Sequence, residues 1–490
     1  MAQHIIVIGS GFSSLSAACY LARAGKCVTV LEKNSGPGGR ARVWEQDGYR
    51  FDMGPSWYWM PEVFEEFFRD FGSQVNDFYS LKRLSPSYRV YFKGEYLDVP
   101  ADPRALEDMF EQREPGSASK LRAFLEDAKY KYETAMREYV ERLSDSIWEF
   151  VDLKLLMKTL QMQLLSSLRA KVRASFQDPA LVAILEFPVL FLGSTPDRTP
   201  AMYSMMNYAD LQLGTWYPEG GMHEIVKGMV AVAEKLGVKF HYNEAVEKIE
   251  VENGKACRVI TASGTYEADW VVAGADYAHV EQQLLEKPWR QYDDAYWNSR
   301  EMSPSSLLYY LGVNRELPGL LHHTLFFDED FDRHAEEIYT TPRWPSDPLF
   351  YVCTASKSDR SIAPEGHENV FLLMPLAVGI EDNEEIREPY FQKMMDRLEA
   401  RTGVDIRSHI VLKRSFCITD FQKDYHSFRG NAYGLANSLR QTAFLKPKMK
   451  SPKVSNLFFA GQLTVPGPGV PPAIISGRIA AREILAASSK

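Results

Sequence analysis

A glycine-rich turn near the start of the chain has the residues and the spacing needed to hold a pyrophosphate. Gly9 and Gly11 follow the β-branched run 5–8, and apolar residues then recur at helical spacing from Leu15 towards Gly25. Glycine permits a tight turn and a close approach of the backbone to a ligand, and the positive end of the following helix favours negative charge. The pattern predicts a phosphate site formed by Gly9, Gly11, Phe12, Ser13 and Ser14.

A second apolar strand, residues 28–31, ends at an acid, Glu32, which lies 23 positions after Gly9. A carboxylate there accepts hydrogen bonds from ribose hydroxyls and repels a 2′-phosphate. Ser14 stands where the usual pattern has its third glycine, so the packing of helix against strand has to accommodate a hydroxymethyl group. We therefore predict a dinucleotide-binding βαβ unit, with Glu32 and Lys33 among its ligands. The alternative is a glycine turn that binds nothing.

The residues after this unit indicate which dinucleotide it binds. Gly36-Pro37-Gly38-Gly39-Arg40 brings a glycine doublet and an arginine close to Glu32. The doublet lets the chain pass near a ligand, and the guanidinium can bind phosphate or neutralise a reduced flavin. A simple nicotinamide dehydrogenase has no need of this element. FAD is therefore the predicted cofactor, with Gly38, Gly39 and Arg40 as ligands, unless the segment is a flexible loop with an arginine facing solvent.

The C-terminal part of the chain repeats the arrangement of strand, glycine loop and helix. An apolar strand ends at Gly461, a loop rich in proline and glycine follows, and helical spacing resumes after Pro471. Proline is favourable at the start of a helix, and the helix dipole would stabilise negative charge on a reduced isoalloxazine. Both ends of the chain are thus predicted to build one cofactor site, here with Gly461, Gln462, Gly469, Val470, Pro471 and Ile474.

Residues 7–56 together with the C-terminal motif resemble the bacterial phytoene desaturase family of carotenoid desaturases, within the amine-oxidase-like flavoproteins. The narrower signal is Phe51-Asp52-Met53-Gly54-Pro55-Ser56, and the likeness covers essentially the whole chain. Pro472 departs from the family, in which many members have glycine. The resemblance implies further cofactor contacts at Met53, Gly54, Pro55, Ser56, Val246, Gly274 and Ala275.

The predicted fold class is α/β, with three parts. Residues 1–90, 215–290 and 450–490 form a Rossmann-type FAD-binding domain, and residues 91–102 and 291–449 form a β-sheet substrate domain. Residues 103–214 form a helical subdomain. Its basic amphipathic stretch either faces an anionic membrane or is a solvated helix face; the cations concerned are Lys154, Lys158, Arg169, Lys171 and Arg173.

Composition narrows the choice of partners and compartment. The 490 residues carry 56 basic and 65 acidic side chains, so nucleic acid is a poor candidate. The five scattered cysteines fit a reducing compartment and predict neither disulfides nor zinc, and no signal peptide or spanning segment is recognisable. We expect a cytoplasmic protein, peripheral on the inner face of the membrane. No metal site is predicted, and the pair His322-His323 is expected at the surface.

The function predicted from the sequence is FAD-dependent desaturation of a long, apolar carotenoid, by hydride transfer to flavin. The preferred prediction is a phytoene desaturase. The alternative is a desaturase of a later biosynthetic step, which acts on the acyclic end of a cyclic or hydroxylated carotenoid. A flavin amine or porphyrinogen oxidase and a flavin-free lipid escort protein are less favoured. No catalytic base is named. Because a second dinucleotide motif is missing, oxygen or a quinone is the expected electron acceptor. The candidate residues for lining the substrate tunnel are Trp57, Tyr58, Trp59, Trp216 and Tyr217.

Overall fold

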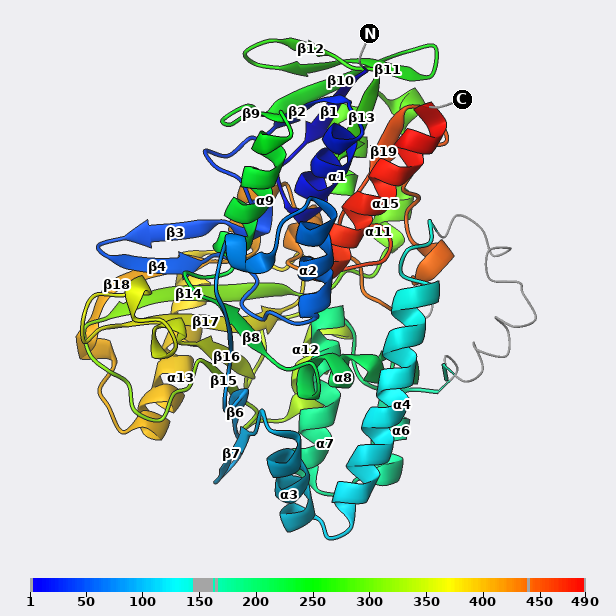
Figure 1. Ribbon diagram of the computed structural model, residues 1–490. Helices are drawn as coiled ribbons and strands as arrows, with labels where there is room; N and C mark the ends of the chain where they lie inside the picture. The colour runs from blue at the N-terminus through cyan, green and yellow to red at the C-terminus, as the bar shows by residue number, and fades with distance from the viewer. Residues whose placement is uncertain (1–2, 144–161, 164–165, 439–440, 489–490) are drawn as a thin grey trace.

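A parallel sheet assembled from three distant parts of the chain carries the cofactor-binding half of the molecule. The computed structural model describes residues 3–143, 162–163, 166–438 and 441–488. The order of the strands is β19-β13-β1-β2-β9, and both chain ends lie beside this sheet (Figure 1). The strands are β1 (His4–Ile8), β2 (Cys27–Leu31), β9 (Lys239–His241), β13 (Trp270–Ala273) and β19 (Leu457–Phe459). The sheet therefore joins N-terminal, middle and C-terminal segments, as the fold class requires.

Three helices cover this sheet, and separate antiparallel strands accompany it. The helices are α1 (Phe12–Arg23), α9 (His223–Lys235) and α15 (Val470–Ser488). A separate antiparallel sheet, β10 (Val246–Glu252), β11 (Lys255–Thr261) and β12 (Thr265–Glu267), turns at Asn253-Gly254. A hairpin, β3 (Val43–Gln46) and β4 (Tyr49–Asp52), leads on to α2 (Pro61–Asp70). The apolar strands are buried because helices lie against the sheet, which is the usual reason for a continuous hydrophobic run.

A mixed seven-stranded sheet forms the second half of the molecule, with the order β18-β14-β17-β16-β15-β6-β7. Its strands are β6 (Tyr88–Tyr91), β7 (Tyr96–Val99), β14 (Ser305–Val313), β15 (His323–Phe326), β16 (Phe350–Cys353), β17 (Glu368–Leu376) and β18 (Ile410–Phe416). β6 and β15 pair in parallel, whereas the other neighbours are antiparallel. The expected domain boundary between residues 90 and 91 falls inside β6, so the second sheet takes residues 88–90 as well.

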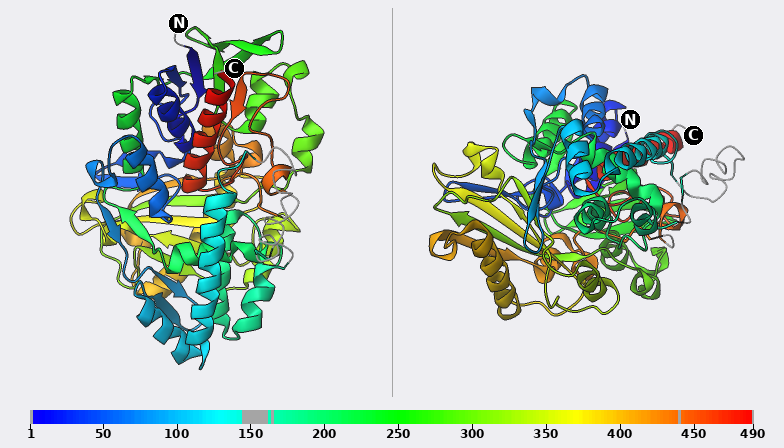
Figure 2. Two further views of the ribbon diagram at one scale, coloured as in Figure 1. Left: turned by 45° about the vertical axis from the view of Figure 1, so that its right-hand side comes forward. Right: turned by 90° about the horizontal axis from the view of Figure 1, so that it is seen from below.

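The helical part lies to the right of the second sheet and extends below it in the view of Figure 1. Its helices are α3 (Pro103–Arg113), α4 (Ser117–Glu138), α6 (Leu168–Ser175), α7 (Pro179–Glu186) and α8 (Met205–Leu211). Asp102 and Asp178 cap α3 and α7, each followed by a proline in the first turn, so local sequence fixes where these helices begin. Seen from below in Figure 2, they lie beside the second sheet.

The basic stretch of this subdomain does not present a free cationic face. Arg169 pairs with Asp332, Lys171 pairs with Asp127, and Arg173 pairs with Glu186 at 3.1 Å. Lys154 and Lys158 lie outside the described residues. A membrane-facing role is therefore not supported by the described cations. Among the described residues, no helix is both long and apolar enough to cross a membrane.

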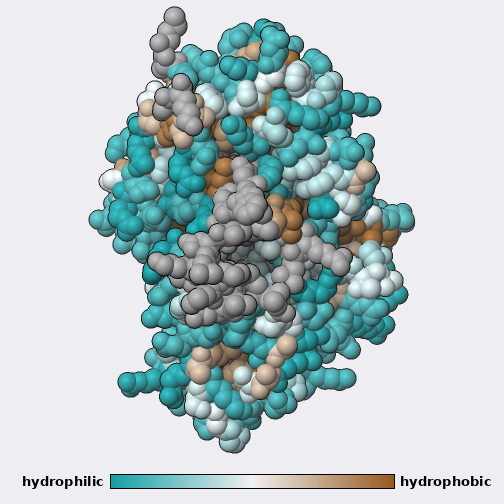
Figure 3. Space-filling model, turned by 90° about the vertical axis from the view of Figure 1, so that its right-hand side faces the viewer, coloured by the Kyte–Doolittle hydropathy of each residue, from teal (hydrophilic) through white to brown (hydrophobic). Residues whose placement is uncertain are grey.

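The remaining elements pack around the second sheet and at its junction with the first. The short strands β5 (Leu81–Arg83) and β8 (Trp216–Pro218) pair with each other. The helices are α10 (Tyr277–His279), α11 (Asp294–Ser299), α12 (Phe331–Tyr339), α13 (Glu384–Thr402) and α14 (Ile418–Tyr425). On the face shown in Figure 3, hydrophilic residues predominate and apolar ones occur in small groups.

Candidate functional site

One cavity of about 920 Å³ runs from the glycine turn after β1 to an apolar wall built on the second sheet and the helical part. Its lining brings together most of the cofactor residues expected from the sequence. These are Gly9, Gly11, Phe12, Ser13, Glu32, Lys33, Gly38, Gly39, Arg40, Met53, Gly54, Pro55, Ser56, Val246, Gly274, Ala275, Gly461, Gln462, Gly469, Val470 and Pro471. Ser14 and Ile474 are buried behind this lining instead.

The backbone at the glycine turn is shaped for close approach. Gly9 has a φ of +89°, in the left-handed region that favours glycine. A Cβ on Gly39 would lie 3.3 Å from the Cα of Gly11, so the glycine doublet rests against the turn with almost no gap. Two loops that are distant in the sequence thus form one wall of bare backbone, and this wall leaves room for a phosphate to reach the N–H groups at the start of α1.

Ser14 is a packing residue. A Cβ on Gly274 would lie 1.9 Å from the Oγ of Ser14, so the missing side chain at residue 274 makes room for the serine. Gly274 follows β13, and its N–H donates to the carbonyl of Ile8 at the end of β1. The glycine missing from the N-terminal motif is therefore compensated by a glycine directly after the neighbouring strand β13. The sequence could not show this exchange, because it depends on the pairing of β1 with β13.

Glu32 is almost completely buried at the end of β2, and both of its carboxylate oxygens already accept hydrogen bonds. Oε2 accepts from the N–H and the hydroxyl of Ser10 at 2.9 and 2.7 Å, and Oε1 accepts from the N–H and the side-chain amide of Asn34 at 2.8 Å each. The two backbone donors fix the carboxylate. The hydroxyl of Ser10 and the amide of Asn34 can rotate, so they can give way to ribose hydroxyls.

Arg40 is partly buried, and its guanidinium faces the ring of Tyr425 at 5.4 Å and donates to Ser427 Oγ at 2.9 Å. When the amide of Gln462 is turned so that its oxygen faces Arg40, that oxygen accepts from both terminal nitrogens at 3.0 Å. The Nε of Arg40 has no hydrogen-bond partner among the described residues. A partly buried cation whose buried Nε donor is unused fits an anionic group such as the pyrophosphate of FAD.

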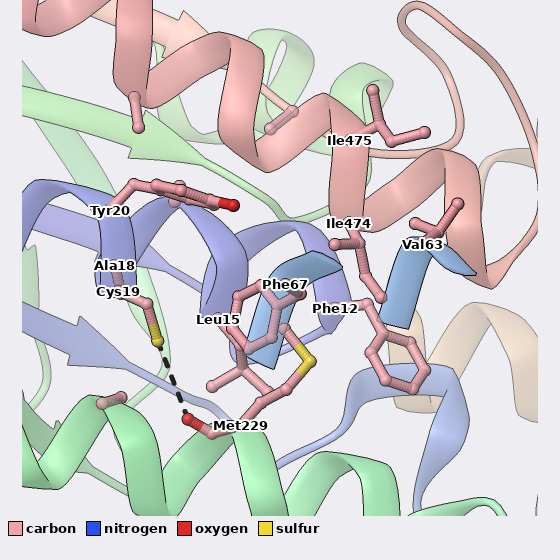
Figure 4. Packing of buried hydrophobic residues seen from close by; sticks show 14 of the residues in the cluster. Phe12, Leu15, Ala18, Cys19, Tyr20, Val63, Phe67, Met229, Ile474 and Ile475 are labelled. Atoms are coloured by element: carbon pink, nitrogen blue, oxygen red, sulfur yellow. Dashed lines mark hydrogen bonds between the residues drawn. The ribbon is translucent and has the colours of Figure 1, made fainter. Parts of the chain in front are cut away.

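The second helix that reaches the cavity is α15, which begins at Val470 after the proline-glycine loop. The hydroxyl of Ser16 on α1 donates to the carbonyl of Ile474 at 2.7 Å. A Cβ on Gly477 would lie 2.1 Å from the carbonyl oxygen of Ser13, so the two helices touch through their backbones. Figure 4 shows Phe12 and Leu15 of α1 packed beside Ile474 of α15. Both helix N-termini therefore point into one cavity, where they favour negative charge.

The far wall of the cavity is apolar and rich in methionine. Sequence reasoning missed most of it, although the methionines close together at residues 202–206 were an available signal. Methionine is flexible and polarizable, so it adapts to an elongated apolar ligand. The methionines of the wall are Met53, Met60, Met136, Met162, Met202, Met205 and Met206; Phe187, Leu308, Leu325 and Phe327 lie among them.

The structure divides the aromatic residues that were expected to line the tunnel. Trp57 and Trp59 line the cavity. Tyr58 is fully buried behind them, with its hydroxyl 3.1 Å from that of Tyr79. Trp216 donates through its indole N–H to the carbonyl of Leu213 at 2.9 Å, and Tyr217 lines a second, smaller cavity. Alternation along the extended chain explains the division, because neighbouring side chains point to opposite faces.

Comparison with known proteins places the chain in a family. The family model for flavin containing amine oxidoreductases matches residues 12–485. The chain belongs to this family. It is 43% identical over 486 residues to a carotenoid 3,4-desaturase of Haloarcula japonica, which covers 99% of this chain and 98% of the relative. It is 32% identical to a zeta-carotene-forming phytoene desaturase of Myxococcus xanthus, with 99% and 94% covered.

Solved structures with the same fold include oxidases with different substrates. The structure of cyclohexylamine oxidase from Brevibacterium oxydans matches with a TM-score of 0.60 and 14% identity over 100% of both chains. A fatty acid isomerase of P. acnes matches with a TM-score of 0.59 and 15% identity, covering 99% of this chain and 98% of the other. At these identities the likeness concerns the fold alone. The predicted family, the FAD cofactor and the oxidoreductase class are confirmed by the family match and the desaturase relatives.

The role of Glu32 is open to a direct test. We expect Glu32→Ala to raise the dissociation constant for FAD at least about tenfold, because hydrogen bonds to a charged group are each worth about 1.5–3 kcal/mol. Glu250→Ala, which removes an acid from β10 outside the cavity lining, is the control. Retained flavin is measured by absorbance after dialysis. Equal retention in the two variants would contradict the assignment.

The exchange between Ser14 and Gly274 gives a second prediction. Gly274→Ala should lower the stability of the protein by about 1–3 kcal/mol, because the added methyl group overlaps the hydroxyl of Ser14. Adding Ser14→Gly to this variant should restore most of the loss. Thermal unfolding of the single and double variants measures the coupling. If the stability losses of Gly274→Ala and Ser14→Gly simply add in the double variant, the contact between these two residues does not determine the packing.

Proposed function

We propose that this chain is an FAD-dependent carotenoid desaturase. The observation that carries the proposal is one continuous cavity, which joins the glycine loops of the flavin site to a long apolar wall, in a chain whose relatives are named as carotenoid desaturases. Bound FAD supplies the two-electron acceptor for the reaction. Removal of a hydride and a proton from neighbouring carbons then adds one double bond to the polyene.

The residues of this chain supply orientation and the exclusion of water. Trp57, Trp59 and the methionines offer a flexible apolar surface along which a polyene can lie. Glu32 and Arg40 would hold the ribose and the pyrophosphate, and the N-termini of α1 and α15 would favour an anionic reduced flavin. A delocalised cation can be stabilised by the polyene itself, so this scheme assigns no catalytic base.

The distribution of acids favours a carotenoid over an amine. The described acids that line the cavity are Glu32, Glu244, Asp276 and Asp424. Asp276 lies beside Arg40, and Asp424 forms an ion pair with Arg42. Lining residues 132–206 and 304–375 include no acid among those described. An ammonium group would therefore lack a partner at the apolar wall, and burying it there is costly.

Two positions of desaturation are compatible with the relatives. The higher identity to the 3,4-desaturase, 43% against 32% for the phytoene desaturase, favours testing a later step beside phytoene desaturation. We also propose that the enzyme works on the cytoplasmic face of a membrane as a peripheral protein, because its substrate is insoluble in water. Because Arg169, Lys171 and Arg173 pair with acids of this chain, they do not form a free basic patch for the membrane. The association would therefore depend on other contacts.

One set of incubations tests both the substrate and the association with a membrane. Purified protein with bound flavin is mixed with anionic liposomes that contain phytoene, lycopene, γ-carotene or hydroxylated γ-carotene. We expect at least one pigment to gain double bonds, seen as a shift of its absorption to longer wavelength, and the protein to float with the vesicles. An unchanged pigment in all four mixtures, with flavin still bound, would overturn the desaturase proposal. Flotation is scored separately and bears only on membrane association.

We further propose oxygen or a membrane quinone as the electron acceptor. The unit made of β1, the glycine turn, α1 and β2 ends at Glu32 and serves one dinucleotide, and no second such βαβ unit is found among the described residues. Anaerobic photoreduction of the flavin, followed by addition of oxygen, a quinone or NAD⁺ in separate cuvettes, tests this. We expect rapid reoxidation by oxygen or quinone and none by NAD⁺. Reoxidation by NAD⁺ alone would mean that a nicotinamide site exists.

A further inference from the structure

Behind the wall of the large cavity, the second sheet brings together two histidines and a cysteine. His322 and His323 were expected at the surface, but their exposed fractions are 5% and 0%, and Cys353 is 7% exposed. His323 on β15 lies directly opposite Cys353 on β16 in the antiparallel register. Their side chains therefore share one face of the sheet. The ligand atoms of the three residues all lie within 4.8 Å of one another.

The two imidazoles have lone pairs and protons to spare. Three of their four ring nitrogens, both of His322 and the Nε2 of His323, have no hydrogen-bond partner among the described residues. Unsatisfied polar atoms at such depth are destabilising, so these nitrogens are suited to bind a ligand. Burial lowers the pKa of both imidazoles, to about 3 for His322, which favours the neutral form that can bind a metal.

The fourth ring nitrogen, Nδ1 of His323, has a hydrogen-bond partner that holds the imidazole ring in place. Nδ1 of His323 lies 2.6 Å from the hydroxyl of Tyr351, which in turn lies 3.0 Å from the hydroxyl of Ser56. If Nδ1 donates to Tyr351 and Tyr351 donates to Ser56, Nε2 carries no proton and keeps its lone pair. A hydrogen bond from the second ring nitrogen to an oxygen is the usual support of a metal-bound histidine.

Space for an ion adjoins the cluster. A cavity of about 30 Å³ is lined by His322, Cys353 and Asp52, which is room for an ion and one water. Asp52 is not free to bind, because its oxygens accept from the N–H groups of Met222 and His223 at 2.7 and 3.0 Å. The protein donors available there are thus two nitrogens and one sulfur.

We propose that His322, His323 and Cys353 bind one Zn²⁺ ion, with a water from the small cavity as the fourth ligand. Two imidazoles and a thiolate are a donor set that zinc prefers, at about 2.0–2.3 Å. Ligand atoms around a tetrahedral zinc ion lie roughly 3.5 Å apart, so the side chains close by about an ångström on binding. The ion would tie β15 to β16 and fix His323, whose ring stacks on Trp57 with centroids 4.0 Å apart. The site would therefore stiffen the wall of the substrate cavity.

Binding must release the thiol proton. Burial raises the pKa of the Cys353 thiol, so the sulfur keeps its proton until the Zn–S bond forms and the proton passes to solvent.

The test uses flavin-loaded protein that has been stripped with a chelator and then dialysed against ZnCl₂. We expect one zinc per chain by mass spectrometry. Cys353→Ser should weaken binding at least about 100-fold. Cys417→Ser, which changes another buried cysteine, should bind like the parent. Retained flavin shows whether each variant is folded.

A measurement on the unaltered protein keeps the proposal independent of the variants. Co²⁺ in place of Zn²⁺ should give intense visible bands of a tetrahedral thiolate site, at wavelengths beyond the flavin absorption. Less than half an equivalent of zinc, weak octahedral cobalt bands, or equal zinc binding by Cys353→Ser and the parent would each overturn the site. None of these results depends on carotenoid turnover.

Discussion

The backbone contact between α1 and α15 is the constraint on which the cofactor site depends. Gly477 has no side chain, and the carbonyl oxygen of Ser13 occupies the space that a Cβ would take. Close contact at this point sets two helix N-termini beside each other, and the hydrogen bond from Ser16 to Ile474 fixes their register. Without it, the two positive helix ends would not converge on one ligand.

The rest of the cavity is arranged around this pair of helices. The first sheet supplies the glycine turn and Glu32, and the second sheet and the helical part supply the apolar wall. The cavity is continuous across the two halves of the molecule. Its flavin end is built on the first sheet, and its long apolar surface is built on the second sheet and the helical part. The same fold occurs in solved structures named as a fatty acid isomerase and a cyclohexylamine oxidase, so the fold by itself does not determine the substrate.

Local patterns in the sequence predicted the flavin loops, because turn, strand and helix signals lie within a few residues of one another. The roles of Ser14, Tyr58 and His323 could not be predicted in this way. Ser14 is accommodated by a glycine that directly follows a strand 260 residues later, and His323 meets Cys353 only through strand pairing. Such contacts depend on register and topology, which hydrophobic periodicity does not encode. The parallel pairing of β6 with β15, which places residues 88–90 in the second sheet, is another contact of this kind.

The late position of β19 and α15 in the chain has a consequence for biosynthesis. β19 is an edge strand of the first sheet, and the loop that follows it forms one side of the flavin cavity. During translation, β1, α1 and β2 emerge first and display their glycine turn hundreds of residues before its counterpart exists. The nascent chain can fold this unit early, but the enclosed cavity forms only after residues 457–488 have left the ribosome. Flavin capture by the whole site therefore has to wait for residues 457–488, and a nascent chain that still lacks them holds only part of the cofactor site.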